Sequence, residues 1–132
     1  MIDNKIRKRK IQTQYLYDKM KEEIGLNIYK YYDSEESNFF SPIFIAEGSK
    51  KGIDIARELN ANGIINSTGT FGLMPANKRQ VFTDYCNGIV ETSRMYTPNS
   101  EKIFEKFIAL SIMENMDTKK LDNIVENLKK CL

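Results

Sequence analysis

The sequence predicts an α+β fold, a two-layer sandwich in which a small, mostly antiparallel sheet carries helices on one face and a long helix begins the chain. Apolar residues recur at helical spacing near both ends of the chain, which predicts two terminal helices. Short apolar runs separated by polar turns lie between them and are typical of hairpin strands. No internal repeat or linker-like segment divides the 132 residues, so we expect a single domain over residues 1–132.

The N-terminal part of the chain is expected to form a helix followed by two strands. A broad apolar stripe predicts the helix over residues 2–24, with Gly25 as its stop. The stripe comprises Ile6, Ile11, Tyr15, Leu16, Met20 and Ile24. The tyrosine-rich run 26–32 and the run 39–46 are predicted strands joined by a polar turn. Pro42 lacks the ladder donor, so it favours an edge position or a bulge in the second strand.

A second helix is predicted over residues 50–62. Ser49 is its expected N-cap, and Gly63 is the left-handed residue expected to end it. Residues 64–65 begin a short predicted strand. The small polar residues of 66–70 follow, and we expect them to form a loop.

The segment after this loop is the least decided by the sequence, because residues 71–95 show no sustained period. A third helix is predicted to run from a cap at Thr97 or Ser100 through Leu110. The apolar residues that share one face of it are Ile103, Phe104, Phe107 and Ile108. Residues 110–113 are predicted to form a further short strand.

The last predicted element is a helix capped by Asp117. Its apolar residues repeat at steps of three and four, which is the spacing of one helical face. They are Leu121, Ile124, Val125, Leu128 and Leu132. The resulting order of helices and hairpin-connected strands supports the two-layer sandwich.

Composition excludes several classes of function. The formal net charge of +2 gives no argument for nucleic acid, and the basic run at residues 5–10 is expected to be a solvated helix face. Histidine is absent, so a His-based triad is excluded and we expect no metal site. No apolar run approaches the ~20 residues of a membrane span. Cys86 and Cys131 are far apart in sequence, and we expect a cytoplasmic protein with reduced thiols.

The loop NSTGTFG, which begins at Asn66, is the candidate binding segment. It matches neither GxxxxGK[ST] nor GxGxxG, so the spacing disfavours a phosphate cradle and leaves a substrate-lining loop or a plain connection. As a lining loop, the amide of Asn66 and the hydroxyls of Thr68 and Thr70 would hydrogen-bond a sugar. Arg79 would pair with a phosphate or carboxylate, or would be an ordinary surface arginine. We expect no catalytic residue in the chain.

Four segments together carry a family resemblance: RKIQTQYLYDKM from Arg9, FFSPIFI, GIDIARELNANGI and ALSIMENMDTKKLDNIVENLKK. Taken together they resemble the C-terminal small domain of fold-type I pyridoxal-phosphate (PLP) enzymes, most closely the DegT/StrS-type sugar aminotransferases. The first segment is similar to the interdomain helix of that family, with an arginine at its start and a tyrosine six residues later. The resemblance spans nearly the whole chain and implies the same sandwich fold.

The departures from that family concern the chemistry. The family's catalytic lysine, the acidic partner of its pyridine nitrogen and most of its phosphate-binding residues lie in a large N-terminal domain that has no counterpart here. The family's loop after Gly-Ile carries a His-Tyr pair, where this chain has residues 67–70 without histidine. The resemblance therefore implies a fragment that binds no cofactor alone, with PLP present only in a complete enzyme. There it would supply a substrate-side wall and part of a dimer contact.

Several biological contexts remain open at this stage. The chain could be a truncated product or one half of a split aminotransferase, whose partner is a separate large-domain chain. Alternatively it is a stand-alone protein-interaction module with the same fold, or a small RNA-binding protein that uses its basic helix. The first helix has more apolar positions than a small sheet covers, so we also expect a homo-oligomer with contacts at Ile2, Ile6 and Ile11.

Overall fold

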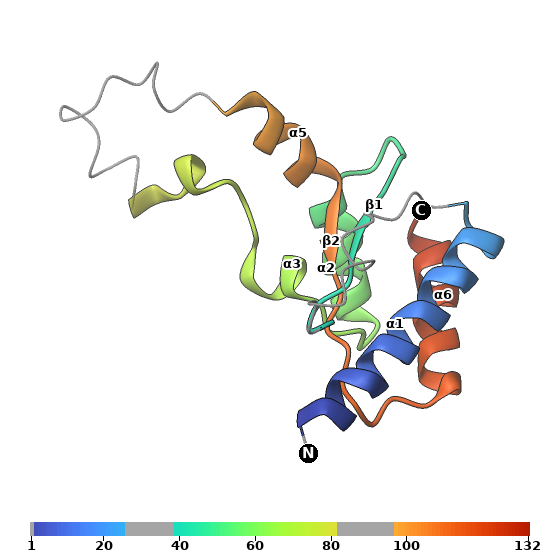
Figure 1. Ribbon diagram of the computed structural model, residues 1–132. Coiled ribbons are helices and arrows are strands. Elements are labelled where there is room, and N and C mark those ends of the chain that lie inside the picture. The colour runs from blue at the N-terminus through green and yellow to red at the C-terminus, as the bar shows by residue number, and fades with distance from the viewer. Residues whose placement is uncertain (1, 26–38, 82–96) are drawn as a thin grey trace.

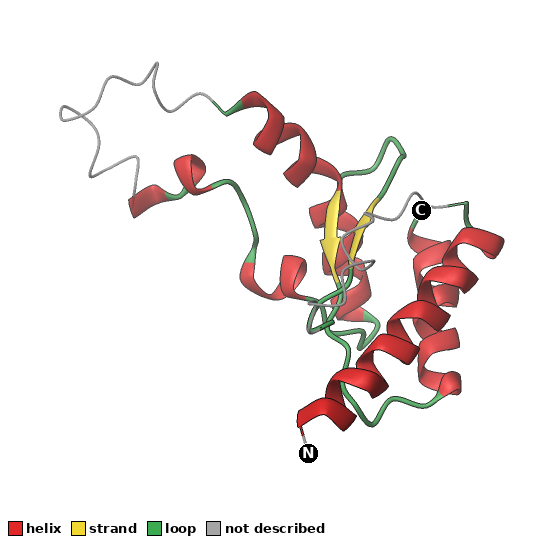
Figure 2. Cartoon of the chain, in the orientation of Figure 1, coloured by secondary structure: helices red, strands yellow, loops and turns green. Residues whose placement is uncertain are grey.

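The computed structural model describes residues 2–25, 39–81 and 97–132, and it has an α+β fold with a long N-terminal helix and a small antiparallel sheet (Figure 1). Helices make up most of the described elements (Figure 2). The strand expected over 26–32 and the turn after it lie outside the described residues, as does the end of the undecided segment. The predicted fold class is confirmed.

Helix α1, Ile2–Glu23, confirms the predicted first helix and packs along the last helix of the chain (Figure 1). Its buried side chains are Gln12, Thr13, Leu16, Tyr17 and Met20. Two of these are polar, and Ile11 from the predicted stripe is 62% exposed, so the inner face is rotated from the expected one. The reason is that α1 meets polar groups as well as apolar ones: the Gln12 side chain donates to the Met116 carbonyl at 2.6 Å.

The sheet has two short strands, β1, Ile43–Ile45, and β2, Phe107–Ala109, paired antiparallel. In the register, Phe44 lies opposite Ile108. The strand predicted over 39–46 is therefore too long. Phe39 has a left-handed φ of 51°, and the proline before β1 has no N–H to donate, so regular pairing begins only after it.

Helix α2, Gly52–Ala61, begins two residues later than predicted, with Lys51 rather than Ser49 as its N-cap. A Cβ at Gly52 would lie 2.7 Å from the carbonyl carbon of Lys106, so the helix start is held against the segment that leads into β2. At the other end Gly63 has φ 79°, which confirms the left-handed residue expected there.

The expected strand at residues 64–65 and the polar loop after it are both wrong. Helix α3, Ser67–Phe71, occupies the segment, and only an isolated bridge between Asn66 and Leu110 extends the sheet here. The Asn66 side chain caps α3 by accepting from the Gly69 N–H at 2.6 Å. A short 3-10 helix, η2 (Ala76–Lys78), follows in the segment that the sequence left undecided.

Helix α5, Pro98–Lys106, begins after Thr97 as predicted but ends before Phe107. The predicted helix to Leu110 and the strand at 110–113 are therefore wrong, because β2 starts where the helix was expected to continue. Pairing with β1 determines this boundary: the Ala46 N–H donates to the Lys106 carbonyl at 2.9 Å, directly beside the ladder. Figure 1 shows α5 and the segment after α3 extending away from α1 and α6.

Helix α6, Thr118–Cys131, confirms the last predicted helix. The Asp117 carboxylate accepts from the Lys120 N–H at 2.9 Å, as expected of an N-cap. The predicted apolar face is buried except for Leu132, which follows the helix and is exposed. This face joins α1, α2 and the sheet in one core, whose largest fully buried side chains include Leu16, Phe44, Ile55, Leu59, Ile108 and Leu128.

Candidate functional site

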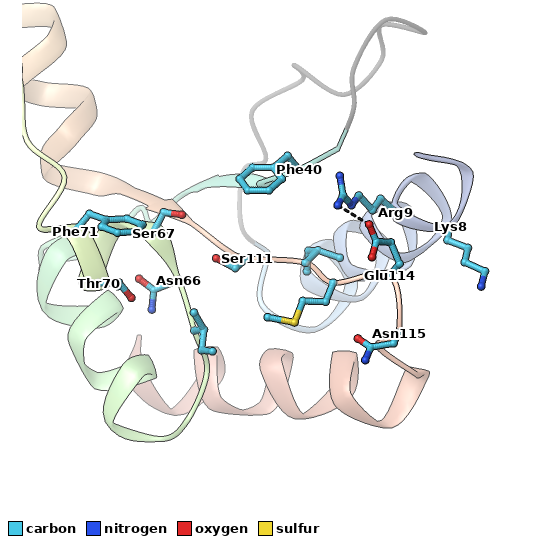
Figure 3. Close-up of a pocket in the computed structure, with 13 residues that line it drawn as sticks. Lys8, Arg9, Phe40, Asn66, Ser67, Thr70, Phe71, Ser111, Glu114 and Asn115 are labelled. Carbon is cyan, nitrogen blue, oxygen red and sulfur yellow. Dashed lines mark hydrogen bonds and ion pairs between the residues drawn. The ribbon is translucent and has the colours of Figure 1, made fainter. Parts of the chain in front are cut away.

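A hollow of about 700 Å³ lies between α1, α3 and the residues that follow β2 (Figure 3). The core fixes all three sides, because α1 and α6 pack together, α3 packs on α2, and the 111–115 segment leads from the sheet into α6. Ile65, Ile112 and Met113 contribute apolar lining. Polar side chains from both ends of the chain converge on the same space, as in small-molecule sites.

One wall of the hollow is an ion pair. Arg9 on α1 donates through Nη2 to Glu114 Oε1 at 2.6 Å, across 105 residues of sequence. The Arg9 guanidinium carbon lies 5.6 Å from the centre of the Phe40 ring, so the ring also holds the cation in place. Arg9 Nε is buried and has no hydrogen-bond partner among the residues that the structure describes. The guanidinium is thus fixed but retains donor capacity.

The opposite wall comes from the start of α3. Asn66 and Thr70 both line the hollow, together with Ser67 and Phe71 (Figure 3). The Asn66 side chain is fully buried and already bonded: Nδ2 donates to the Ala56 carbonyl at 2.8 Å and to Asn60 Oδ1 at 2.9 Å. Thr70 is exposed, and its hydroxyl accepts from Asn60 Nδ2 at 3.3 Å.

The other two predicted lining residues lie elsewhere. The Thr68 hydroxyl is buried and accepts from the Ala109 N–H at 2.9 Å, which ties α3 to β2. Arg79 is exposed at the end of η2 and is not among the side chains that surround the hollow. The structure therefore brings Asn66 and Thr70 together at one site and places Thr68 and Arg79 apart from it.

Sequence reasoning missed the residues that complete the site: Arg9, Phe40, Ser111 and Glu114. No spacing signal connects Arg9 with Glu114, because their contact depends on how α1 packs beside α6. Phe40 falls within the strand predicted over residues 39–46, although it lines the hollow and is 63% exposed. An aromatic residue two positions before a proline is the one local signal that could have marked it.

The lysines argue against a PLP site within the described part of the chain. A Schiff-base lysine is favoured by burial or a nearby cation that lowers its pKa, yet none of the described lysines is buried. Lys50 shows the opposite tendency, because its hydrogen bond to the Glu58 carboxylate raises the pKa of its ammonium group. These residues do not fit PLP.

The described residues allow four further comparisons with the expectations. Among them, no three His, Cys, Asp or Glu side chains gather where they could hold a metal ion. The helices described in residues 2–25, 39–81 and 97–132 are all too short or too polar to cross a membrane. On α1, Ile2 is 72% exposed, Ile11 is exposed, and Ile6 is half-buried. Cys131 is buried and free, and Cys86 lies outside the described residues.

The chain belongs to the DegT/DnrJ/EryC1/StrS aminotransferase family, whose profile matches residues 1–129. A search of curated proteins gave no match. Among solved structures, the chain is similar to a protein described as a sugar aminotransferase from Streptococcus pneumoniae, in its PMP form. The two are 20% identical with a TM-score of 0.72, and the match covers 96% of this chain and 30% of the other.

Two other solved structures share the fold. The Helicobacter pylori aminotransferase PseC, involved in the biosynthesis of pseudoaminic acid, is 14% identical with a TM-score of 0.73. A GDP-4-keto-6-deoxymannose-3-dehydratase with a trapped PLP-glutamate geminal diamine is 16% identical with a TM-score of 0.60. Each match covers 96% of this chain but only 32% and 31% of the related chain. The chain therefore spans about a third of the length of these relatives.

Proposed function

We propose that this chain acts as the C-terminal small domain of a PLP-dependent sugar aminotransferase and is not catalytically competent alone. The observation that carries the proposal is the combination of a family match over nearly the whole chain with coverage of about 30% of related solved chains. PLP would be bound by the part of the related enzymes that this chain does not match. The lack of a buried lysine in the described part of this chain supports that division of roles.

In this role the hollow beside α3 forms part of the substrate-side wall. Asn66 and Thr70 line it from the α3 side, as the lining proposal requires. Thr68 does not line the hollow but positions α3, because its hydroxyl accepts a hydrogen bond from the Ala109 N–H of β2. Arg79 would contribute only if the partner chain brings the substrate to the end of η2. Sugar hydroxyls would meet the polar groups of this wall while the partner supplies the reacting atoms.

The proposed contacts to a second chain lie on α1. Ile2 and Ile11 are large apolar side chains left exposed, and Ile6 is half-buried between them in sequence. Covering such side chains removes apolar surface from water, at roughly 25 cal/mol for each Å². The second chain is either the large domain or another copy of this chain.

The test begins with the chain alone. Incubation with PLP, borohydride reduction and peptide mass spectrometry should find no lysine that carries stoichiometric pyridoxyl label. One lysine labelled stoichiometrically would overturn the proposal, because the chain would then hold the cofactor itself. The second step expresses the chain together with the product of the reading frame adjacent to its gene. Co-purification and a new aldimine absorbance band should result if that frame encodes the large domain.

A stand-alone interaction module with the same fold is the second candidate, favoured by the exposure of Ile2 and Ile11. The two candidates differ in what the partner contains. If the chain co-purifies from its native cell with a partner that has neither bound PLP nor transaminase activity, the interaction module is correct. Replacement of Ile2 by Lys should weaken capture in both cases, whereas replacement of the exposed Lys51 by Gln serves as the matched surface control.

A further inference from the structure

A second groove, of about 450 Å³, lies between α2, α5 and the segment that joins α3 to η2. All three parts contribute apolar side chains to its lining, namely Ile53, Leu73, Met74 and Phe104. Met74 is 43% exposed and Phe104 is half-buried, so this apolar surface is only partly covered. The groove shares no lining residue with the hollow beside α3, so the two surfaces are separate.

α5, which forms one side of this groove, is only partly covered by the rest of the chain. It has nine residues, and none of them is buried. A helix of fewer than about 12–15 residues is marginal in water without packing, so α5 depends on contacts with other surfaces. Its contacts with α2 and β1 supply part of them, and Figure 1 shows α5 extending away from α1 and α6. A surface that covered the groove would therefore stabilise α5 as well.

The charges around the groove are divided between its two helices. α2 contributes the cations Lys51 and Arg57. α5 contributes the carboxylates Glu101 and Glu105. Glu101 is already engaged, because Lys78 of η2 lies 3.3 Å from it. Glu105 has no ion pair within the described part of the chain, and Arg57 has only a loose contact of 3.8 Å within its own helix. One cation and one carboxylate thus remain available on opposite sides of an apolar centre.

This pattern of charge suits a second copy of the same chain. In a two-fold symmetric dimer a patch meets itself, so the patch has to be complementary to itself. An apolar centre with a cation on one side and a carboxylate on the other meets this requirement, because the rotation places the α2 side of one copy against the α5 side of the other. A purely acidic partner would be attracted by Arg57 but repelled by Glu105, so the charges favour a second copy.

We infer that two copies of this chain associate through the groove between α2 and α5. Met74 and Phe104 of each copy lie at the centre, and Arg57 of one copy lies opposite Glu105 of the other. The contact involves neither α1 nor PLP, so it is independent of the proposed function, and its failure would leave the PLP labelling result unaffected. The groove has fewer residues than the about 20–30 on each side of a standard interface, so we expect a weak dimer with a Kd on the order of 100 µM.

Sedimentation equilibrium of the purified chain, from about 10 µM to about 1 mM, tests for this monomer–dimer equilibrium. Met74→Gln should raise the dissociation constant about tenfold, because it removes apolar surface from the centre of the contact. Ile103→Gln is the matched control: this residue of α5 has a similar exposure of 45% but does not line the groove, so the variant should associate like the unaltered chain. A chain that stays monomeric throughout, or equal losses in the two variants, would overturn the inference.

Charge reversals separate a contact between copies from an interaction within one chain. Arg57→Glu alone and Glu105→Arg alone should each raise the dissociation constant about tenfold or more, since each brings two pairs of like charges together across the two-fold axis. An equimolar mixture of the two variants should dimerise like the unaltered chain, because opposite charges then meet at both positions. A folding defect cannot produce this recovery, and circular dichroism checks that each variant is folded. A mixture that associates no better than the single variants would overturn the inference, as would a dimer that only Ile11→Lys disrupts.

Discussion

Replacing Asn66 with alanine should destabilise the fold strongly, although the residue also lines the hollow. The side chain is fully buried and makes four hydrogen bonds within the chain. It caps α3 through the Gly69 N–H, and loss of an N-cap costs about 1 kcal/mol. It also donates to the Ala56 carbonyl and to Asn60, and each such net hydrogen bond contributes about 1 kcal/mol. The free energy of unfolding should therefore fall by about 2–4 kcal/mol.

Urea denaturation followed by circular dichroism measures this change, with the m-value as a check that the denatured state is unaltered. Asn66→Asp is the informative companion, because it keeps an acceptor for the Gly69 N–H but cannot donate to the Ala56 carbonyl. We expect Asn66→Asp to be destabilised about as much as Asn66→Ala. If Asn66→Ala loses less than about 0.5 kcal/mol, the side chain is not an anchor of α3 and the reasoning is refuted.

Three further predictions concern single contacts. In Gly69→Ala the new Cβ would lie 2.6 Å from the Ala56 carbonyl oxygen, so the free energy of unfolding should fall by at least about 2 kcal/mol. Gly48→Ala is the control, because no atom lies within 4 Å of its Cβ, and in thermal melts it should be neutral or slightly stabilising. Asp117→Ala should lose about 1 kcal/mol by urea denaturation while Asp117→Ser retains most of the cap; equal losses in both would contradict the capping role. The hydrogen bond from Lys50 lowers the pKa of the Glu58 carboxyl below its ordinary 4.5. The pair therefore stabilises the fold at and above pH 4.5, and this contribution is lost as the pH falls below that value. Glu58→Gln should flatten this part of the stability–pH curve, and an unchanged curve would contradict the pairing.

The elements that were predictable are those whose signals are local. α6 has a capping aspartate directly before its first residue and a continuous apolar face within its 14 residues. The long first helix was likewise visible from its spacing, but its rotation was not. That rotation depends on which groups α6 and the following residues offer, such as the Met116 carbonyl that accepts from Gln12.

The elements that were mispredicted depend on contacts between distant segments. Phe107 and Ile108 continue the helical spacing of α5, yet they form β2 because Ile43–Ile45 lies beside them. α3 has only five residues, rich in Ser, Thr and Gly, which is too short and too weak a sequence to form a helix by itself. Side chains of α2 and the cap at Asn66 stabilise it, and neither contact is visible in the spacing of α3 itself.

The candidate site shows the same limit. The sequence singled out the segment that begins at Asn66, because small polar residues after a predicted strand are typical of binding loops. Half of the hollow, however, comes from the two ends of the chain through the contact of Arg9 with Glu114. In the sequence Arg9 belongs to a basic run and to a helix that resembles the family's interdomain helix, and no property of residues 5–10 distinguishes it from its neighbours. Its role follows from the fold.

The geometry of α1 limits how a second chain can cover its exposed apolar residues. With about 3.6 residues per turn, Ile2 and Ile6 lie about 40° apart around the helix, and Ile11 lies about 140° from Ile6. Ile6 lies within about 20° of Thr13, which is buried, so Ile2 and Ile6 extend the buried face of α1 toward its N-terminus. Ile11 lies on the other side. One flat partner surface can cover the first pair or Ile11, but it cannot cover all three.

Charge then distinguishes between the two kinds of partner. Lys5, Arg7, Lys8 and Lys10 are exposed on the same half of α1, and Arg9 is the one cation of this run with an ion pair among the described contacts. Two copies of this helix placed against each other would bring these cations together, and the repulsion would oppose the gain from covering the isoleucines. A chain that surrounds an apolar centre with carboxylates would be attracted instead. We therefore expect a partner surface with carboxylates to cover this part of α1 better than a second copy of the same helix would.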